Sequence, residues 1–249
     1  MRQVTFLDLD DTLLQTRHKC PPGEPIEAVA WQRDGQPMSY MTSRQKAFLD
    51  RMESLGSLVF VTARTTDSLR RVRLPKNAWH VTSFGAAIRT PDGNPFIAYN
   101  HAVIADLQPV LVILEDLKKQ LHDASMGTGV RVRLIDDEGL PVYIVAKHPG
   151  GRGSALDPLE SFARTILPPQ FFLHRNGNNL ALVPQVVAKE RAVRYLIETT
   201  FPATEWTSLG VGDSHTDGPF LACCDWRIVP SNSQLSRRLD HRYPPETTR

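Results

Sequence analysis

Short apolar runs, separated by longer stretches of helical period, constrain the fold of this chain more than any other feature. The runs are residues 4–7, 58–61, 207–211 and 227–229, and the helical stretches are residues 43–55, 66–73 and 188–200. Strands that are nearly all apolar are typical of a parallel sheet covered on both faces. With 249 residues, 41% of them hydrophobic, the chain can form a sizeable core. The pattern predicts an open α/β sheet.

Two further segments do not fit this simple alternation. Residues 28–40 and 86–99 each contain a turn signal between apolar stretches, which predicts two hairpins. The middle of the chain then shows an αββ pattern twice, with helices at residues 103–122 and 155–166 and strands at 130–135, 142–147, 171–174 and 180–183. We therefore expect a discontinuous core of residues 1–100 and 184–249, and an inserted α/β domain of residues 101–183 with an antiparallel sheet.

Polar side chains follow three of the predicted core strands. Asp8 and Asp10 follow the first, Thr62 follows the second, and Asp213 and Asp217 follow the third. The carboxyl ends of parallel strands meet at one edge of a sheet, where α/β proteins bind ligands. We expect the Asp8 and Asp10 carboxylates to be neighbours, because residues two apart in a strand point the same way. These two carboxylates, together with that of Asp213, would suit a Mg²⁺ ion bound beside a substrate phosphate.

These residues resemble the sequence motifs of the haloacid dehalogenase superfamily, in their usual order. The resemblance covers about residues 1–85 and 184–232, and the place of the insert resembles the type-two (α/β) cap of the sugar-phosphate phosphatase subgroup. It implies a Rossmann-like core with a smaller cap. The chain departs from the family pattern at Asp11, often glycine, at Thr216, often asparagine, and at Phe84, where some relatives have asparagine. The matching residues are Asp8-Leu9-Asp10-Asp11-Thr12, Thr62, Lys189 and Gly212-Asp213-Ser214-His215-Thr216-Asp217.

The resemblance implies the Mg²⁺-dependent hydrolysis of a small phosphomonoester, such as a sugar phosphate. Asp8 would attack phosphorus to form an aspartyl phosphate, and Asp10 would act as general acid and then general base. Thr62 and Lys189 would hold the phosphoryl group and the nucleophile. The implied metal ligands are Asp8, Asp10 through its backbone carbonyl, Asp213 and Asp217.

Ordinary structural roles compete with these assignments. Aspartates after strands are often caps or turn formers, a strand-end threonine such as Thr62 is common, and most helix lysines are solvated. A lysine in the first turn of a helix opposes the macrodipole, which favours a functional role for Lys189. In the insert, we expect Arg152, Arg175 and Asn178 to bind substrate from flexible loops.

Net charge and cysteine content limit the binding partners and the compartment that we expect. The chain has 29 basic and 27 acidic residues, a net charge of +2, which does not favour nucleic acid. No apolar run approaches the roughly 20 residues that span a bilayer, and three cysteines without paired spacing favour a reducing compartment. We expect a cytoplasmic monomer or homodimer that binds a phosphate ester and no membrane. The alternatives are a phosphotransferase or phosphomutase, and a non-catalytic regulatory module that binds a phosphate ligand.

Overall fold

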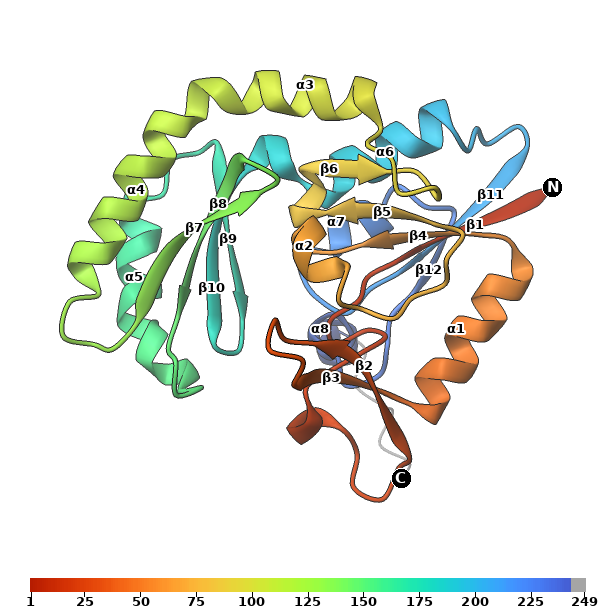
Figure 1. The fold of residues 1–249 in the computed structure, drawn as a ribbon, viewed down its shortest axis with the longest axis horizontal. Helices are drawn as coiled ribbons and strands as arrows, with labels where there is room; N and C mark the ends of the chain where they lie inside the picture. The colour runs from red at the N-terminus through yellow and green to blue at the C-terminus, as the bar shows by residue number, and fades with distance from the viewer. Residues whose placement is uncertain (243–249) are drawn as a thin grey trace. The chain divides into compact units, whose positions relative to one another are not determined.

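The chain folds into two compact units. The computed structural model describes residues 1–242, so residues 243–249 of the predicted core segment lie outside the described residues. One unit contains Met1–Phe96 and the chain from Lys189 on, and the other is Ile97–Ala188. The first unit holds a largely parallel sheet and the second an antiparallel sheet, which confirms the predicted fold class (Figure 1).

The core unit is built on a six-stranded sheet. Five adjacent strands of the sheet run parallel, and the sixth, at one edge, pairs antiparallel to its neighbour. All four predicted strands are present, and the sequence pattern missed the strand at residues 78–82. In spatial order the strands are β12 (Trp226–Ile228), β11 (Trp206–Val211), β1 (Arg2–Leu7), β4 (Ser57–Val61), β5 (Ala78–Thr82) and β6 (Ala87–Arg89).

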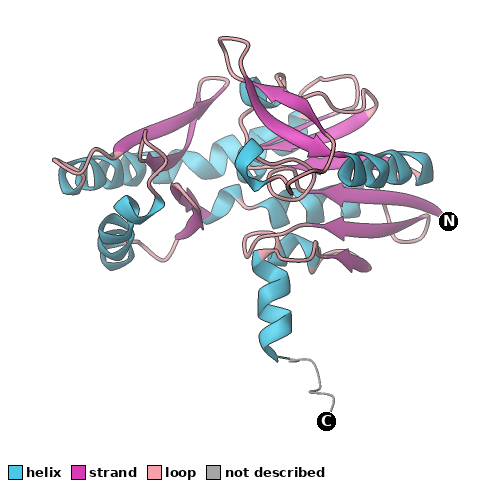
Figure 2. Cartoon of the chain, turned by 90° about the horizontal axis from the view of Figure 1, so that it is seen from below, coloured by secondary structure: helices cyan, strands magenta, loops and turns pink. Residues whose placement is uncertain are grey.

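The helices of this unit begin and end at local signals in the sequence. Helix α1 (Ser43–Leu55) starts with a capping box, in which the Thr42 hydroxyl accepts from Gln45 N and the Gln45 side chain accepts from Thr42 N. Its residues Leu49 and Met52 pack into the core beside β4. The other helices are α2 (Thr66–Leu69), α6 (Lys189–Thr199), α7 (Gly218–Leu221) and α8 (Gln234–Arg242), the last helix of the described residues (Figure 2).

Two predictions about this unit need correction. The helix expected over residues 66–73 ends at Leu69, as α2. The chain then leaves the helical path, and Arg73 N donates to Val29 O. The hairpin expected over residues 86–99 is shortened, because β6 pairs with β5 and helix α3 begins at Ile97. The other hairpin is present as β2 (Ile26–Trp31) and β3 (Pro37–Thr42), and Gln15 and Tyr40 exchange two backbone hydrogen bonds that fix it to the loop after β1.

The second unit is a four-stranded antiparallel sheet with helices on one face (Figure 1). The sheet order is β7 (Arg131–Asp137), β8 (Leu140–Lys147), β10 (Asn179–Pro184) and β9 (Phe171–Asn176), and the helices are α3 (Ile97–Leu107), α4 (Leu111–Ala124) and α5 (Asp157–Ile166). Apolar side chains from α4, α5 and the strands form one buried cluster. Short 3₁₀ helices connect the elements of both units: η1 (Arg17–Lys19), η2 (Ser83–Gly85), η3 (Gln108–Val110), η4 (Gly153–Leu156) and η5 (Gln185–Val187).

One helical segment passes a test for a membrane-spanning helix by length and composition. Residues Ile97–Ser125 form a helical segment of 29 residues, and an 18-residue window within it has a mean hydropathy of 1.5, so it is long and apolar enough to cross a membrane by length and composition alone. Polar residues such as Asn100 and Asp106 interrupt the segment, so it contains no long uninterrupted apolar run. Core helices of globular proteins pass the same test, and Leu114, Leu117 and Leu121 on its second half are buried in the apolar cluster.

Gly56, at the junction of α1 and β4, gives a test of the core packing. A Cβ atom at this position would lie 2.1 Å from the backbone oxygen of Gln3 in β1. We expect Gly56→Ala to lower the free energy of unfolding by about 1–3 kcal/mol or more, because backbone must move to relieve the contact. Gly218→Ala is the matched control, since no atom lies within 4 Å of its added Cβ. Chemical denaturation measures both, and equal stabilities would contradict this packing.

Candidate active site

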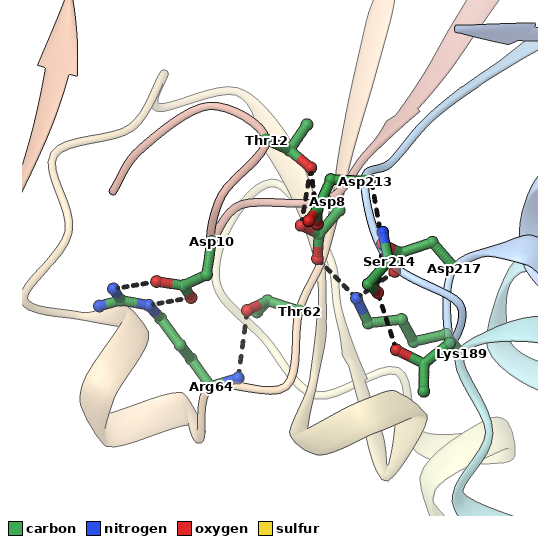
Figure 3. A network of polar contacts seen from close by, with 10 residues as sticks. Asp8, Asp10, Thr12, Thr62, Arg64, Lys189, Asp213, Ser214 and Asp217 are labelled. Atoms are coloured by element: carbon green, nitrogen blue, oxygen red, sulfur yellow. Dashed lines mark hydrogen bonds and ion pairs between the residues drawn. The ribbon is translucent and has the colours of Figure 1, made fainter. Parts of the chain in front are cut away.

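The carboxyl ends of three neighbouring strands carry the predicted site residues. Asp8 follows β1, Thr62 follows β4 and Asp213 follows β11, and β1 lies between the other two strands in the sheet. Lys189 is the first residue of α6. Each of these four side chains is buried, with no more than 5% of the residue exposed. Parallel pairing therefore brings together residues that are far apart in the sequence (Figure 3).

Lys189 connects two of the carboxylates. Its Nζ donates to Asp8 Oδ1 at 2.5 Å and to Asp217 Oδ1 at 2.7 Å. The other Asp8 oxygen accepts from the Thr12 hydroxyl at 2.9 Å. Burial alone would lower the pKa of Lys189, but Asp217 and Asp8 outweigh it and raise that pKa above its usual value. The lysine is therefore a fixed positive charge against the Asp8 carboxylate.

Asp217 organises the loop after β11. Its Oδ2 accepts from Asp213 N at 3.1 Å, from Ser214 N at 2.9 Å and from the Ser214 hydroxyl at 2.7 Å. The residue is fully buried, and a Cβ atom on Gly212 would lie 2.7 Å from the Cβ of Asp217. Glycine at position 212 thus lets the Asp217 carboxylate approach the loop backbone.

Three carboxylates gather close to the ammonium group of Lys189. One carboxylate oxygen from each of Asp8, Asp213 and Asp217 lies within 4.8 Å of the others. Burial and then the charge of Asp217 raise the pKa of Asp8, and the same causes raise the pKa of Asp213 to about 7. Crowded, buried oxygen ligands with excess negative charge suit a hard divalent cation such as Mg²⁺. These three residues fit the expected metal site.

Asp10 lies apart from this cluster. Arg64 donates to it in a bidentate ion pair, with Nε and Nη2 each 2.7 Å from a carboxylate oxygen, and Figure 3 shows Asp10 turned toward Arg64 and away from Asp8. The expected pairing of the Asp8 and Asp10 carboxylates is therefore not present. The reason is local, because β1 ends at Leu7 and Asp11 adopts a positive φ of 65°, so strand alternation does not extend to Asp10.

Thr62 lies at the end of β4 and its side chain faces the next loop. Its hydroxyl accepts from Arg64 N at 3.1 Å, and its own N donates to Val81 O in β5. This contact fixes the turn that carries Arg64. The expected role of the Thr62 hydroxyl toward a phosphoryl group stays a prediction.

The predicted substrate-binding residues of the second unit take part in loop contacts. Asn178 exchanges hydrogen bonds with the backbone of His148, accepting at 3.2 Å and donating at 2.6 Å. Arg175 donates to Gly153 O at 2.7 Å and to Asp157 at 3.0 Å, near the start of α5. Arg152 is exposed and has one nitrogen 3.2 Å from His148 Nε2. Their role toward a substrate stays a prediction.

Sequence reasoning missed two residues that shape the site. Thr12 lies within the first predicted motif, and its hydroxyl contacts Asp8 at 2.9 Å and Asp213 at 3.4 Å. Arg64 stands two residues after Thr62, and its side chain is 9% exposed. A signal was present in both cases, because each is a donor in the loop directly after a strand that carries a predicted catalytic residue.

Solved structures of other proteins share this architecture, although comparisons with family models and with curated proteins find no match. No protein-family model and no curated protein match the chain. The C-terminal domain of a C. albicans trehalose-6-phosphate phosphatase matches with a TM-score of 0.58 and 14% identity, covering 89% of this chain and 73% of that one. A Synechocystis sucrose-phosphatase, solved with sucrose and phosphate, matches with a TM-score of 0.55 and 16% identity over 97% of each chain.

A trehalose-6-phosphate phosphatase related protein also matches, with a TM-score of 0.50 and 15% identity over 97% of this chain and 96% of that one. The chain shares the fold of these three proteins. At these identities the likeness concerns the fold. Within that fold, the Asp8, Lys189, Asp213 and Asp217 group occupies the sheet edge where α/β proteins bind ligands.

The crowding of carboxylates predicts how the stability of the folded protein depends on pH and on bound metal. Because the pKa of Asp213 is about 7 in the fold and 3.8 without it, the folded state binds more protons between these values. Stability of the metal-free protein should therefore fall as the pH rises from about 4 to 7. Asp213→Asn should raise the melting temperature of the metal-free protein at pH 8 by several degrees.

Mg²⁺ should raise the melting temperature of the wild type more at pH 8 than at pH 6, because protons compete for Asp213. In Asp213→Asn this metal effect should be largely lost. Thermal melts with Mg²⁺ or with a chelator measure both effects, and Asp50→Asn, on the exposed face of α1, is the matched control. A destabilised Asp213→Asn protein with an unchanged response to Mg²⁺ would contradict the assignment.

Proposed function

We propose that this chain is a Mg²⁺-dependent phosphatase that hydrolyses a small phosphomonoester through an aspartyl phosphate on Asp8. The observation that carries the proposal is the buried Asp8 carboxylate, held by Lys189 on one oxygen and Thr12 on the other, beside two more buried carboxylates. A carboxylate that is fixed and desolvated in this way is suited to attack an electrophile. Binding of an anionic ester next to it requires positive charge, which Lys189 supplies in part.

In the first step, an Asp8 oxygen forms a bond to phosphorus as the bond to the leaving oxygen breaks. Lys189 keeps the attacking group oriented and balances charge on the phosphoryl oxygens, an electrostatic role that needs no rearrangement. In the second step, water attacks phosphorus and the bond to Asp8 breaks, which returns the carboxylate. Bound between Asp8, Asp213 and Asp217, Mg²⁺ would neutralise charge on the carboxylates and the phosphoryl group.

Asp10 is the proposed acid and base. It would give its proton to the leaving oxygen in the first step and take one from water in the second. The Asp10 side chain is 43% exposed and is held by Arg64, so its carboxylate must exchange this partner for the substrate. Arg64 Nη1 is buried without a hydrogen-bond partner, which leaves a donor for a substrate oxygen.

The substrate class rests on the fold and on the second unit. Solved structures of the same fold include proteins named as phosphatases of trehalose 6-phosphate and of sucrose phosphate. For this chain we propose a sugar phosphate or a similar polar phosphate ester. In this proposal the unit Ile97–Ala188 is the cap that selects the leaving group, with Arg152, Arg175 and Asn178 as its candidate contacts.

The test compares phosphate release from a panel of phosphomonoesters by the wild type and by Asp8→Asn. We expect Mg²⁺-dependent release by the wild type, and at least a thousandfold loss in the variant because the amide cannot act as the nucleophile. Asp11→Asn is the matched control, since it makes the same change three residues away in a carboxylate that pairs with Lys19. It should keep most of the activity.

Equal turnover by Asp8→Asn and the wild type would contradict the proposal. Absence of release from every ester, together with phosphoryl transfer to an added alcohol, would favour a phosphotransferase. Absence of both would favour a regulatory module that binds a phosphate ligand.

A further inference from the structure

The two faces of the antiparallel sheet in the second unit differ in character. The helices of this unit lie on one face (Figure 1), where Ala146 in β8 and Leu180 in β10 belong to the buried apolar cluster. Successive side chains of a strand point to opposite faces, so the next residues, Lys147 and Asn179, point to the other face. Arg131 in β7 is paired with Lys147 and shares its face. This second face is therefore polar at one end of the sheet.

Two cations of this face are direct neighbours. Arg131 and Lys147 are opposite each other in the register of β7 and β8, and both are exposed. Directly opposed side chains have Cβ atoms about 4.5–5.5 Å apart, and like charges at such positions are destabilising. Within residues 1–242, no carboxylate forms an ion pair with either of them. An anion that contacts both side chains would relieve this repulsion.

Protection of the sheet edge does not account for the pair. Cations on an edge strand hinder its pairing with another chain, and β7 is an edge strand, so Arg131 could serve this purpose. Lys147 belongs to β8, which has β7 on one side and β10 on the other. A second cation on an inner strand, opposite the first, points instead to a ligand of negative charge.

The neighbouring side chains indicate what kind of anion fits. Asn179 in β10 is paired with Lys147 on its other side and is exposed, and its amide can donate to and accept from a hydroxyl. In the adjacent row of the same face, Arg133 is opposite Val145, which offers apolar surface to a carbon skeleton. The guanidinium of Arg131 matches the planar geometry of a carboxylate. These features together suit a small molecule that carries a carboxylate and hydroxyl groups.

We propose that Arg131, Lys147 and Asn179, the cationic row, bind the carboxylate end of a sugar acid. The inference rests on the proposed function, in which the unit Ile97–Ala188 selects the leaving group of the substrate. The substrate is then a phosphate ester of a sugar acid, with one acidic group for the catalytic site and a second one for the cationic row. Hydrolysis releases phosphate and the free sugar acid.

Two ligands that differ at one carbon test the proposal. In 6-phosphogluconate C1 is a carboxylate, and in glucitol 6-phosphate it is a hydroxymethyl group. Calorimetric titration in the Asp8→Asn background with Mg²⁺ measures their affinities without turnover. We expect 6-phosphogluconate to bind about tenfold more tightly, because a charged hydrogen bond is worth about 1.5–3 kcal/mol.

Added to this background, Arg131→Gln or Lys147→Gln should each reduce the preference to about twofold, mainly by weakening the binding of 6-phosphogluconate. The matched control is Lys119→Gln, which makes the same change at an exposed position on α4 and should keep the preference. All three changed side chains are exposed, so the proteins should fold.

Three results would overturn the proposal: equal affinity for the two ligands, a preference that both row variants keep, or an equal loss of preference in Lys119→Gln. Stronger dependence on the row for glucitol 1,6-bisphosphate than for 6-phosphogluconate would overturn the choice of a carboxylate. Failure of the proposed function is a separate result, namely phosphate release that persists in Asp8→Asn, and the binding preference is measured independently of it.

Discussion

The buried ion pair between Lys189 and two aspartates is the interaction on which the site depends. The lysine is 5% exposed, and it contacts Asp8, 5% exposed, and Asp217, fully buried. Removing charges from water carries a large desolvation penalty, which close contact and further hydrogen bonds must offset. Thr12 supplies such a bond to Asp8, and the loop backbone supplies them to Asp217. The site is therefore a satisfied polar network inside a largely apolar core.

The parallel sheet makes this network possible. Because β1 pairs with β11, the loops that carry Asp8 and Asp213 leave the sheet side by side, and α6 presents Lys189 from its first turn. Gly212 allows the Asp217 carboxylate to reach the loop backbone. The excess of carboxylates over ammonium groups then raises the pKa of Asp8 and of Asp213. The fold thus gathers the carboxylates, and their excess negative charge makes the site suited to a cation.

The sequence predicted the parts of this structure that follow from local pattern. The strands before Asp8, Thr62 and Asp213 are short and apolar, and α1 covers the predicted residues 43–55. Strand β5 was missed because Trp79 and His80 break the apolar pattern. The partner of Asp10 could not be predicted, because the path of the chain after Leu7 depends on a positive φ at Asp11 and on Arg64, 54 positions away.

The central claim is that Asp8 carries the phosphoryl group, and trapping this intermediate tests it most directly. The protein would be mixed with its best ester and Mg²⁺ and quenched within one turnover. Borohydride would then reduce any acyl phosphate to homoserine, and mass spectrometry would locate the change. We predict homoserine at position 8, absent when substrate is omitted. Turnover with no modification at Asp8, or with modification at Asp10 instead, would contradict this account.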